Sequence, residues 1–149
     1  MERTLVLIKP DGVQRGLVGN IVSRLESKGL KIVGMKLMKV TEELAKQHYG
    51  EHTDKPFFAD LVKFITSSPV VAMAIAGDNS VQVVRSIMGP TDPQVAPPGT
   101  IRGDFGLSIG MNLIHGSDSI SSASRELELF FRSSELLNYE RDLDNWVIE

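Results

Sequence analysis

Short apolar segments with strand-like composition alternate along this chain with segments in which apolar residues recur at helical spacing. The strand-like segments are residues 4–8, 30–40 and 70–76, and the last is apolar throughout, as is typical of a strand at the centre of a sheet. Helical spacing covers approximately residues 18–28, a short segment after Thr41, and residues 57–65, 80–88 and 119–131. Strands and helices that interleave in this way predict an α/β sandwich, in which helices pack on one sheet.

Polar residues mark where several of these elements begin or end. Lys9-Pro10-Asp11-Gly12 is typical of a turn that closes the first strand. Thr41 is expected to cap the helix that follows it, and Asp78 or Asn79 to cap the helix that ends at Gly89. In the last helix, the spacing predicts that the following residues face inward: Ile120, Ala123, Leu127, Phe130 and Phe131.

The segment from Gly89 to Asp118 breaks this alternation. Its 30 residues contain six glycines and four of the seven prolines, and they show no helical period. In residues 105–113, every second residue is apolar, which predicts the edge of a fourth strand or an ordered lead-in to it. Long segments without regular structure are usually functional or disordered. Because predicted elements flank this segment on both sides, we predict a binding loop.

Composition excludes several kinds of site. The chain has 149 residues and no cysteine, which excludes a thiol nucleophile, a thiolate zinc site and a disulfide framework. No apolar stretch approaches the ~18 residues that suggest a membrane span, and the start lacks a secretory pattern. The net charge of −3 argues against a general nucleic-acid-binding surface. We therefore expect a single cytoplasmic domain over residues 1–149, with no membrane and no nucleic-acid partner.

Two common kinds of binding motif are missing or incomplete. Neither G-x-x-x-x-G-K-[ST] nor G-x-G-x-x-G occurs, so a bound nucleotide would have to be held by side chains, a role that suits arginine. His48 and His52 have the spacing of metal ligands on a helix. However, Gly50 weakens that helix, and Tyr49 stands where the zincin motif has glutamate, so the pattern argues against a metal site there.

His115 lies in the segment 112–118 (NLIHGSD), at the predicted junction of a strand and the last helix. Its spacing continues the alternation of residues 105–113, so on pattern alone a core histidine is the simpler interpretation. Small and polar residues follow it directly, however, and junctions of this kind often display catalytic groups. His115 is therefore a candidate catalytic residue, with a core histidine as the alternative.

Several long motifs resemble those of the nucleoside diphosphate kinase family, in the same order and over nearly the full chain. Residues 112–118 match the family's active-site signature, and residues 98–105 (PGTIRGDF) match the stretch before it. Residues 4–13 (TLVLIKPDGV) are similar to the family's start. His48-Tyr49 and residues 55–58 (KPFF) resemble its nucleotide-binding region.

The resemblance implies a catalytic role for several of these positions. His115 would be the nucleophile that accepts the terminal phosphoryl group of a nucleoside triphosphate and passes it to a diphosphate, a ping-pong mechanism with a phosphohistidine intermediate. Glu126 and Ser117 would support the imidazole ring, and Tyr49 would pack beside it and Lys9. A neutral imidazole is a competent nucleophile at neutral pH, provided that one tautomer is held in place.

Other matching positions would bind the substrate. The base would stack on Phe57 with Ile109 on its other side, which predicts that ATP, GTP and deoxynucleotides are all accepted. On pattern alone, Phe57 is better explained as a core residue, and Arg85 equally well as a surface charge. Phosphates or sugar hydroxyls would be contacted by Lys9, Arg85, Thr91, Arg102 and Asn112.

The fold, cofactor and assembly also follow from the resemblance. It implies a ferredoxin-like fold with a four-stranded antiparallel sheet, and Mg²⁺ carried by the nucleotide phosphates and not by protein ligands. Family members are hexamers or, in some bacteria, tetramers, and the tail at residues 137–149 resembles that of hexameric members. We therefore expect a hexamer, with a tetramer as the alternative. Two other classes remain open, a non-catalytic nucleotide sensor and a nucleic-acid-binding regulator, although the pI of about 5.6 disfavours the second.

Overall fold

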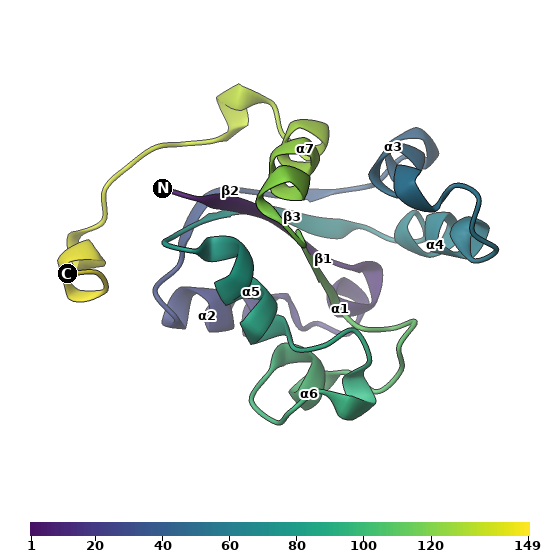
Figure 1. The fold of residues 1–149 in the computed structure, drawn as a ribbon, viewed down its shortest axis with the longest axis horizontal. Helices are drawn as coiled ribbons and strands as arrows, with labels where there is room; N and C mark the ends of the chain where they lie inside the picture. Colours follow the sequence, from purple (N-terminus) through teal and green to yellow (C-terminus); the bar gives the residue numbers. More distant parts are fainter.

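The computed structural model describes residues 1–149, except for the side chain of Glu51, and its centre is a four-stranded antiparallel sheet (Figure 1). The strands are β1 Arg3–Ile8, β2 Lys31–Met38, β3 Val70–Ala76 and β4 Ile114–Gly116. They lie in the order β2-β3-β1-β4. β3 is buried along its whole length, which confirms the central position that its apolar composition predicted.

Helices cover both faces of this sheet (Figure 1). Successive residues of a strand point to opposite faces, so β1 contributes to two cores. Leu5 and Leu7 pack with residues of α3 Glu42–His48, α4 Phe58–Ile65 and α7 Ile120–Phe130. Val6 and Ile8 pack with residues of α2 Val18–Ser27, α5 Ser80–Met88 and α6 Ile101–Phe105. The predicted α/β sandwich and its ferredoxin-like antiparallel sheet are thereby confirmed.

Shorter helical segments complete the fold. Pro10–Gln14 forms α1, so Lys9-Pro10-Asp11-Gly12, predicted to be a turn, opens a short helix instead. Proline suits the first helical position because an N–H at that position would have no partner within the helix, so the helix loses no hydrogen bond. Three-residue or five-residue 3₁₀ turns occur at Gly50–His52, Pro93–Val95, Ser133–Glu135 and Asp142–Trp146.

The helix caps agree only in part with the sequence. Thr41 caps α3 as predicted, since its side chain accepts a hydrogen bond from the Leu44 amide. Asn79 precedes α5 in a left-handed conformation, with φ of 56°, and its side chain makes no capping hydrogen bond. The carboxylate of Glu2 accepts a hydrogen bond from the Val81 amide at 2.8 Å instead. The predicted cap of α5 is therefore wrong, because a residue distant in sequence performs this role.

The structure corrects part of what the sequence predicted for the segment 89–118. The segment contains α6 and the 3₁₀ turn Pro93–Val95, although no helical period is visible in its sequence. Of the two alternatives for residues 105–113, the edge of a strand is wrong, since β4 begins only at Ile114, and an ordered lead-in to that strand is what the structure has. Its apolar residues Leu107, Ile109 and Met111 are exposed instead. Ile120, predicted to face inward, also lies exposed, in the first turn of α7.

The conformation of Leu113 explains why the alternating residues before it do not join the sheet. It has a φ of 74°, a left-handed conformation that is uncommon for a leucine. Two hydrogen bonds hold it there: the Lys9 amide donates to its carbonyl at 2.9 Å, and its own amide donates to Asp11 Oδ2 at 3.0 Å. The chain therefore turns at Leu113, and only the residues after it pair with β1.

The chain after α7 runs along the outside of the domain to the C-terminus (Figure 1). The Leu137 amide donates to the Val33 carbonyl at 2.8 Å, and Arg141 donates to the carbonyls of Gly29 and Leu30. Trp146 near its end is 90 % exposed. Among the helices described here, none combines the length and apolar character needed to cross a membrane.

Candidate active site

The short strand β4 presents His115 to the helix α7. His115 pairs with Leu7 in the sheet register and therefore points to the same face as Leu7, the face that α7 covers. Glu126 lies in the middle of α7, on the side that faces the sheet, and is buried. Its Oε1 is 3.0 Å from His115 Nε2 and accepts a second hydrogen bond from Ser117 Oγ at 2.6 Å. The structure thus brings together His115, Glu126 and Ser117, three of the residues predicted to be catalytic along with Lys9 and Tyr49.

Glu126 is ionised at any ordinary pH. Burial opposes its ionisation, but the hydrogen bond and charge of His115, together with the hydrogen bond from Ser117, outweigh this and lower its pKa to about 2. A carboxylate can only accept hydrogen bonds. Nε2 of His115 is therefore the protonated nitrogen when the ring is neutral, and Nδ1 keeps its lone pair.

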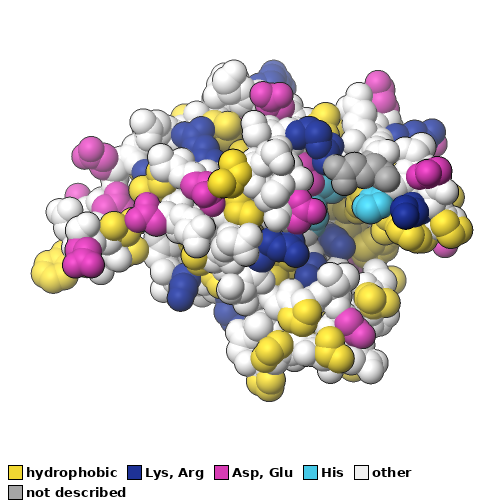
Figure 2. Space-filling model, in the orientation of Figure 1, with side chains coloured by type: hydrophobic (Ala, Val, Ile, Leu, Met, Phe, Trp, Pro, Cys, Tyr) yellow, Lys and Arg dark blue, Asp and Glu magenta, His cyan; other side chains and the backbone are white. Residues whose placement is uncertain are grey.

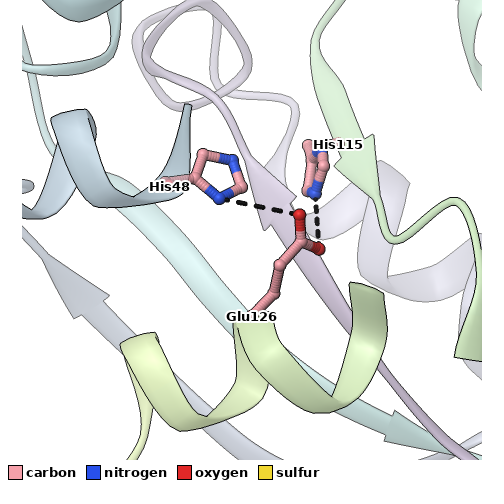
Figure 3. A group of neighbouring side chains, drawn as sticks. All are labelled: His48, His115 and Glu126. Carbon is pink, nitrogen blue, oxygen red and sulfur yellow. Dashed lines mark hydrogen bonds and ion pairs between the residues drawn. The ribbon is translucent and has the colours of Figure 1, made fainter. Parts of the chain in front are cut away.

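His48 completes this centre from the end of α3, as Figure 3 shows. Its Nδ1 is 3.7 Å from Glu126 Oε2, and its ring meets that of His115 edge-on with centroids 4.8 Å apart. Burial and the neighbouring His115 lower the pKa of His48 to about 3, so it is neutral. The sequence singled out His48 as a possible metal-binding partner of His52 and as part of a motif similar to the family's nucleotide-binding region, and it assigned His48 no contact with His115 or Glu126. Instead, the group of described residues able to hold a metal ion is His48, His115 and Glu126.

Near β4, cationic and amide side chains form a connected network. Lys9 Nζ donates to Asn112 Oδ1 at 2.8 Å, and Asn112 Nδ2 donates to the Thr91 carbonyl at 3.0 Å. Burial, together with the charge of Arg102, lowers the pKa of Lys9 to about 8. Arg85 lies close by, with its Nη1 3.5 Å from the Gly116 carbonyl. Lys9, Arg85, Thr91, Arg102 and Asn112, predicted from the sequence as substrate-binding residues, therefore lie around one strand.

Arg102 is almost fully buried and binds three backbone carbonyls. Its Nε, Nη1 and Nη2 donate to Asn112, Gly89 and Ile114 at 3.2, 3.0 and 2.6 Å. Burial and the charge of Arg85 lower its pKa to about 10, which still leaves it charged near neutrality. These bonds attach α6 to both ends of the glycine-rich segment, so Arg102 shapes the loop as well as adding charge.

The three aromatic and aliphatic candidates differ in burial. Tyr49 packs on His48 with ring centroids 4.7 Å apart, and burial raises the pKa of its hydroxyl to about 12. Phe57 is 46 % exposed and lies just before α4, not within it, which disagrees with the core position that its pattern favours. Ile109 is exposed as well. Both residues therefore present apolar surface to solvent.

A hollow of about 140 Å³ opens beside His115. In Figure 2, histidine side chains lie in a recess with Lys and Arg side chains next to it. Three lining residues were not assigned a role from the sequence: Asp118, Ser122 and Arg125. Ser122 lies four residues before Glu126 and three before Arg125, so helical spacing from Ser122 was the signal that could have connected these residues.

Comparison with known proteins agrees with this geometry. The model of the nucleoside diphosphate kinase family matches residues 2–136. A nucleoside diphosphate kinase of Pelotomaculum thermopropionicum is 60% identical over 149 residues, which is 100% of both chains. That of Archaeoglobus fulgidus is 56% identical over 149 residues, 100% of this chain and 99% of its own.

Solved structures show the same similarity. The nucleoside diphosphate kinase of Halobacterium salinarum in complex with CDP superposes with a TM-score of 0.98 at 58% identity, covering 99% of both chains. A family member from Babesia bovis gives a TM-score of 0.97 at 44% identity, over 99% of this chain and 100% of its own. The chain therefore belongs to the nucleoside diphosphate kinase family, whose enzymes transfer phosphate between nucleoside triphosphates and diphosphates.

Proposed function

We propose that this enzyme works in two half-reactions through a phosphohistidine on His115. The observation that carries the proposal is the hydrogen bond between His115 Nε2 and the ionised, buried Glu126. Since this bond holds the proton on Nε2, Nδ1 is the nucleophile. In the first half-reaction its lone pair attacks the terminal phosphorus, an N–P bond forms, and the bond to the leaving diphosphate oxygen breaks. A terminal oxygen of the acceptor diphosphate then attacks, and the N–P electron pair returns to Nδ1.

The cations around β4 supply the positive charge that the transferred phosphoryl group needs. Phosphoryl transfer depends on positioning and on neutralising charge, with little covalent work by the protein. Lys9 and Arg85 would contact the phosphates, and Asn112 and Thr91 the phosphates or sugar hydroxyls. Arg102 has N–H groups beyond the three that its carbonyl partners use, because a guanidinium carries five.

Mg²⁺ would come with the nucleotide. It prefers oxygen ligands, and the centre around His115 offers two imidazole nitrogens and one carboxylate, so phosphate oxygens and not these residues would hold it. When bound, it neutralises part of the polyphosphate charge.

Phe57 and Ile109 would hold the base. Both expose apolar surface, and stacking accepts every base because each has a π face. ATP, GTP and deoxynucleotides would therefore all be substrates, which agrees with a relative solved in complex with CDP.

The assembly would be a hexamer of single-domain subunits in the cytoplasm, with a tetramer as the alternative. β2 is an edge strand whose exposed residues include Met35 and Leu37, and subunit pairing would cover such an edge.

Intact-mass measurement tests the chemistry directly. After incubation with ATP and Mg²⁺, we expect one acid-labile phosphoryl group per chain, removed by GDP and not formed in His115→Ala. A nucleotide sensor would bind ATP without any gain in mass. A phosphoryl group retained in His115→Ala would overturn the assignment.

A further inference from the structure

His48 has no part in the phosphoryl transfer proposed above, yet it points its Nδ1 toward the carboxylate of Glu126 (Figure 3). The side chain is buried, and among the described residues this Nδ1 finds no hydrogen-bond partner. One ligand atom each from His48, His115 and Glu126 lies within 4.8 Å of the other two. A buried nitrogen without a partner, aimed at a carboxylate and a second imidazole, indicates a ligand that binds all three.

The chemistry of these atoms fits a transition-metal cation. Two imidazole nitrogens and one carboxylate are a ligand set of open zinc sites, which keep a fourth position for water. Zn²⁺ lies about 2.0–2.2 Å from such ligands, so its ligand atoms are roughly 3.3 Å apart in a tetrahedron. The longest separation here, up to 4.8 Å, would have to shorten by about 1.5 Å, a movement within reach of side-chain torsions.

The surroundings provide the rest of such a site. Ser117 Oγ donates to Glu126 Oε1 at 2.6 Å and would orient the carboxylate, as outer-shell partners of metal ligands do. The hollow of about 140 Å³, which His48, His115 and Glu126 help to line, leaves room for a water in the fourth position.

We propose that His48, His115 and Glu126 form a reversible site for Zn²⁺ or a similar cation, and that metal binding there switches off His115 as a nucleophile. A neutral imidazole that binds a metal through Nε2 carries its proton on Nδ1. The proton on His115 Nε2, which is hydrogen-bonded to Glu126, would leave to solvent, and Nδ1 would take up a proton. Nδ1 would then have no lone pair for phosphorus. The metal site stands on its own geometry, whereas the switch rests on the proposed phosphohistidine.

Nearby cations would make this binding exchangeable. Arg125 Nη2 is 3.9 Å from Glu126 Oε2, and the charges of Arg125 and Lys9 both act on His48. These two cations oppose a metal ion while the single carboxylate attracts it. The site is therefore expected to bind and release the ion, unlike a structural zinc site.

Metal binding is tested without nucleotide. The full chain is titrated with Co²⁺, which gives visible absorption bands when four-coordinate, and with Zn²⁺ by calorimetry. We expect saturable binding of one ion, weakened at least about tenfold in His48→Gln and in Glu126→Gln. The matched control is His52→Gln, which removes the histidine four residues away and should bind as tightly as the unmodified chain. Absence of four-coordinate bands, or equal affinity in His48→Gln, would refute the site.

The switch is tested in the unmodified chain, so the result does not depend on whether a variant folds. In ¹⁵N spectra of the His115 ring, Zn²⁺ should move the proton from Nε2 to Nδ1. At a free Zn²⁺ concentration set by a metal buffer, the rate of single-turnover phosphorylation should fall in proportion to occupancy and recover after chelation. Binding without loss of rate would disprove the switch. Failure to phosphorylate even without zinc would instead count against the proposed function and leave the metal site intact.

Discussion

At the scale of single residues, the centre depends on one carboxylate that serves two partners. Glu126 Oε1 accepts hydrogen bonds from His115 Nε2 and from Ser117 Oγ, and the residue is almost fully buried. A buried charge is stable only when it is paired and hydrogen-bonded. Glu126 in turn sets which nitrogen of His115 is protonated. Removal of its charge therefore affects both stability and the tautomer.

Glu126→Gln is expected to slow phosphorylation of His115 by about 10²–10³-fold, the typical cost of losing one preorganised electrostatic partner. The amide keeps the shape of the side chain but no longer demands a proton on Nε2. Single-turnover mass measurement gives the rate. Ser122→Ala, on the same face of α7, is the control and should change the rate far less. An unchanged rate in Glu126→Gln would show that the tautomer is held by another group.

Ser117→Ala removes the other hydrogen bond to the same oxygen. We expect a smaller loss of rate, about tenfold, and a destabilisation of about 1–3 kcal/mol, because a buried carboxylate loses one donor. Urea unfolding gives the free energy, and Ser122→Ala, on the same face of α7 as Glu126, is the control. Equal rates in Ser117→Ala and the unmodified chain would mean that His115 alone orients Glu126.

The lowered pKa of Lys9 predicts that nucleotide binding depends on pH. Burial and Arg102 lower its pKa to about 8, so its ammonium is charged below pH 8 and loses its proton as the pH rises through that value. Affinity for ADP should therefore fall between about pH 7.5 and 9 in the free enzyme. Lys9→Arg keeps a charge across this range and should flatten the profile. Calorimetric titration at several pH values measures it, and a parallel decline in both proteins would assign the effect to another group.

At the scale of elements, β4 is placed by its contacts with the first strand and α1. Leu113 is held in a left-handed conformation by the Lys9 amide and the Asp11 carboxylate, and the residues after it then pair with β1. The position of His115 thus depends on Asp11, for which the sequence predicted only a place in a turn. Strain of this kind persists only where the surrounding structure enforces it.

Asp11→Ala is expected to destabilise the fold by about 1–3 kcal/mol, because the buried Leu113 amide loses its acceptor. It should also slow phosphorylation, since β4 is no longer fixed. Asp11→Asn is the matched control, because its amide oxygen can still accept this hydrogen bond, and it should retain most of the stability. Urea unfolding and single-turnover rates are the measurements. Similar losses in both variants would point to the charge of Asp11 and not to the hydrogen bond.

At the scale of the whole molecule, a strongly apolar sheet is covered on both faces but keeps an exposed edge. Met35 and Leu37 lie on the edge strand β2, and Leu107 and Met111 are exposed in the loop before β4. The C-terminal segment adds Trp146, which is 90 % exposed. These surfaces are in keeping with subunit contacts in the proposed assembly.

Trp146 is the only tryptophan, so intrinsic tryptophan emission reports on the C-terminal segment alone. If the segment packs on a neighbouring subunit, emission should lie at short wavelength in the assembled protein and shift to longer wavelength on dilution. Sedimentation over the same concentrations should give a hexamer. A stable tetramer would contradict the hexamer, and emission that does not change during dissociation would exclude Trp146 from the interface.

Prediction from the sequence succeeded where structure is local or where a motif covers the site. The apolar run of β3, the spacing in α2 and α5, and the Thr41 cap depend on neighbouring residues, and each was predicted correctly. The assembly of His115, Ser117 and Glu126 followed from the family resemblance, because spacing alone left His115 open as a core residue.

By itself, the sequence determined the α/β alternation, the central strand and the family, because periodicity and motifs are properties of neighbouring positions. Only the tertiary structure decided that Glu2 caps α5, that the alternating residues before Leu113 leave the sheet, and that His48 meets His115 and Glu126. Each of these joins residues far apart in the chain. Such contacts arise from how strands and helices pack, and no local pattern encodes that packing.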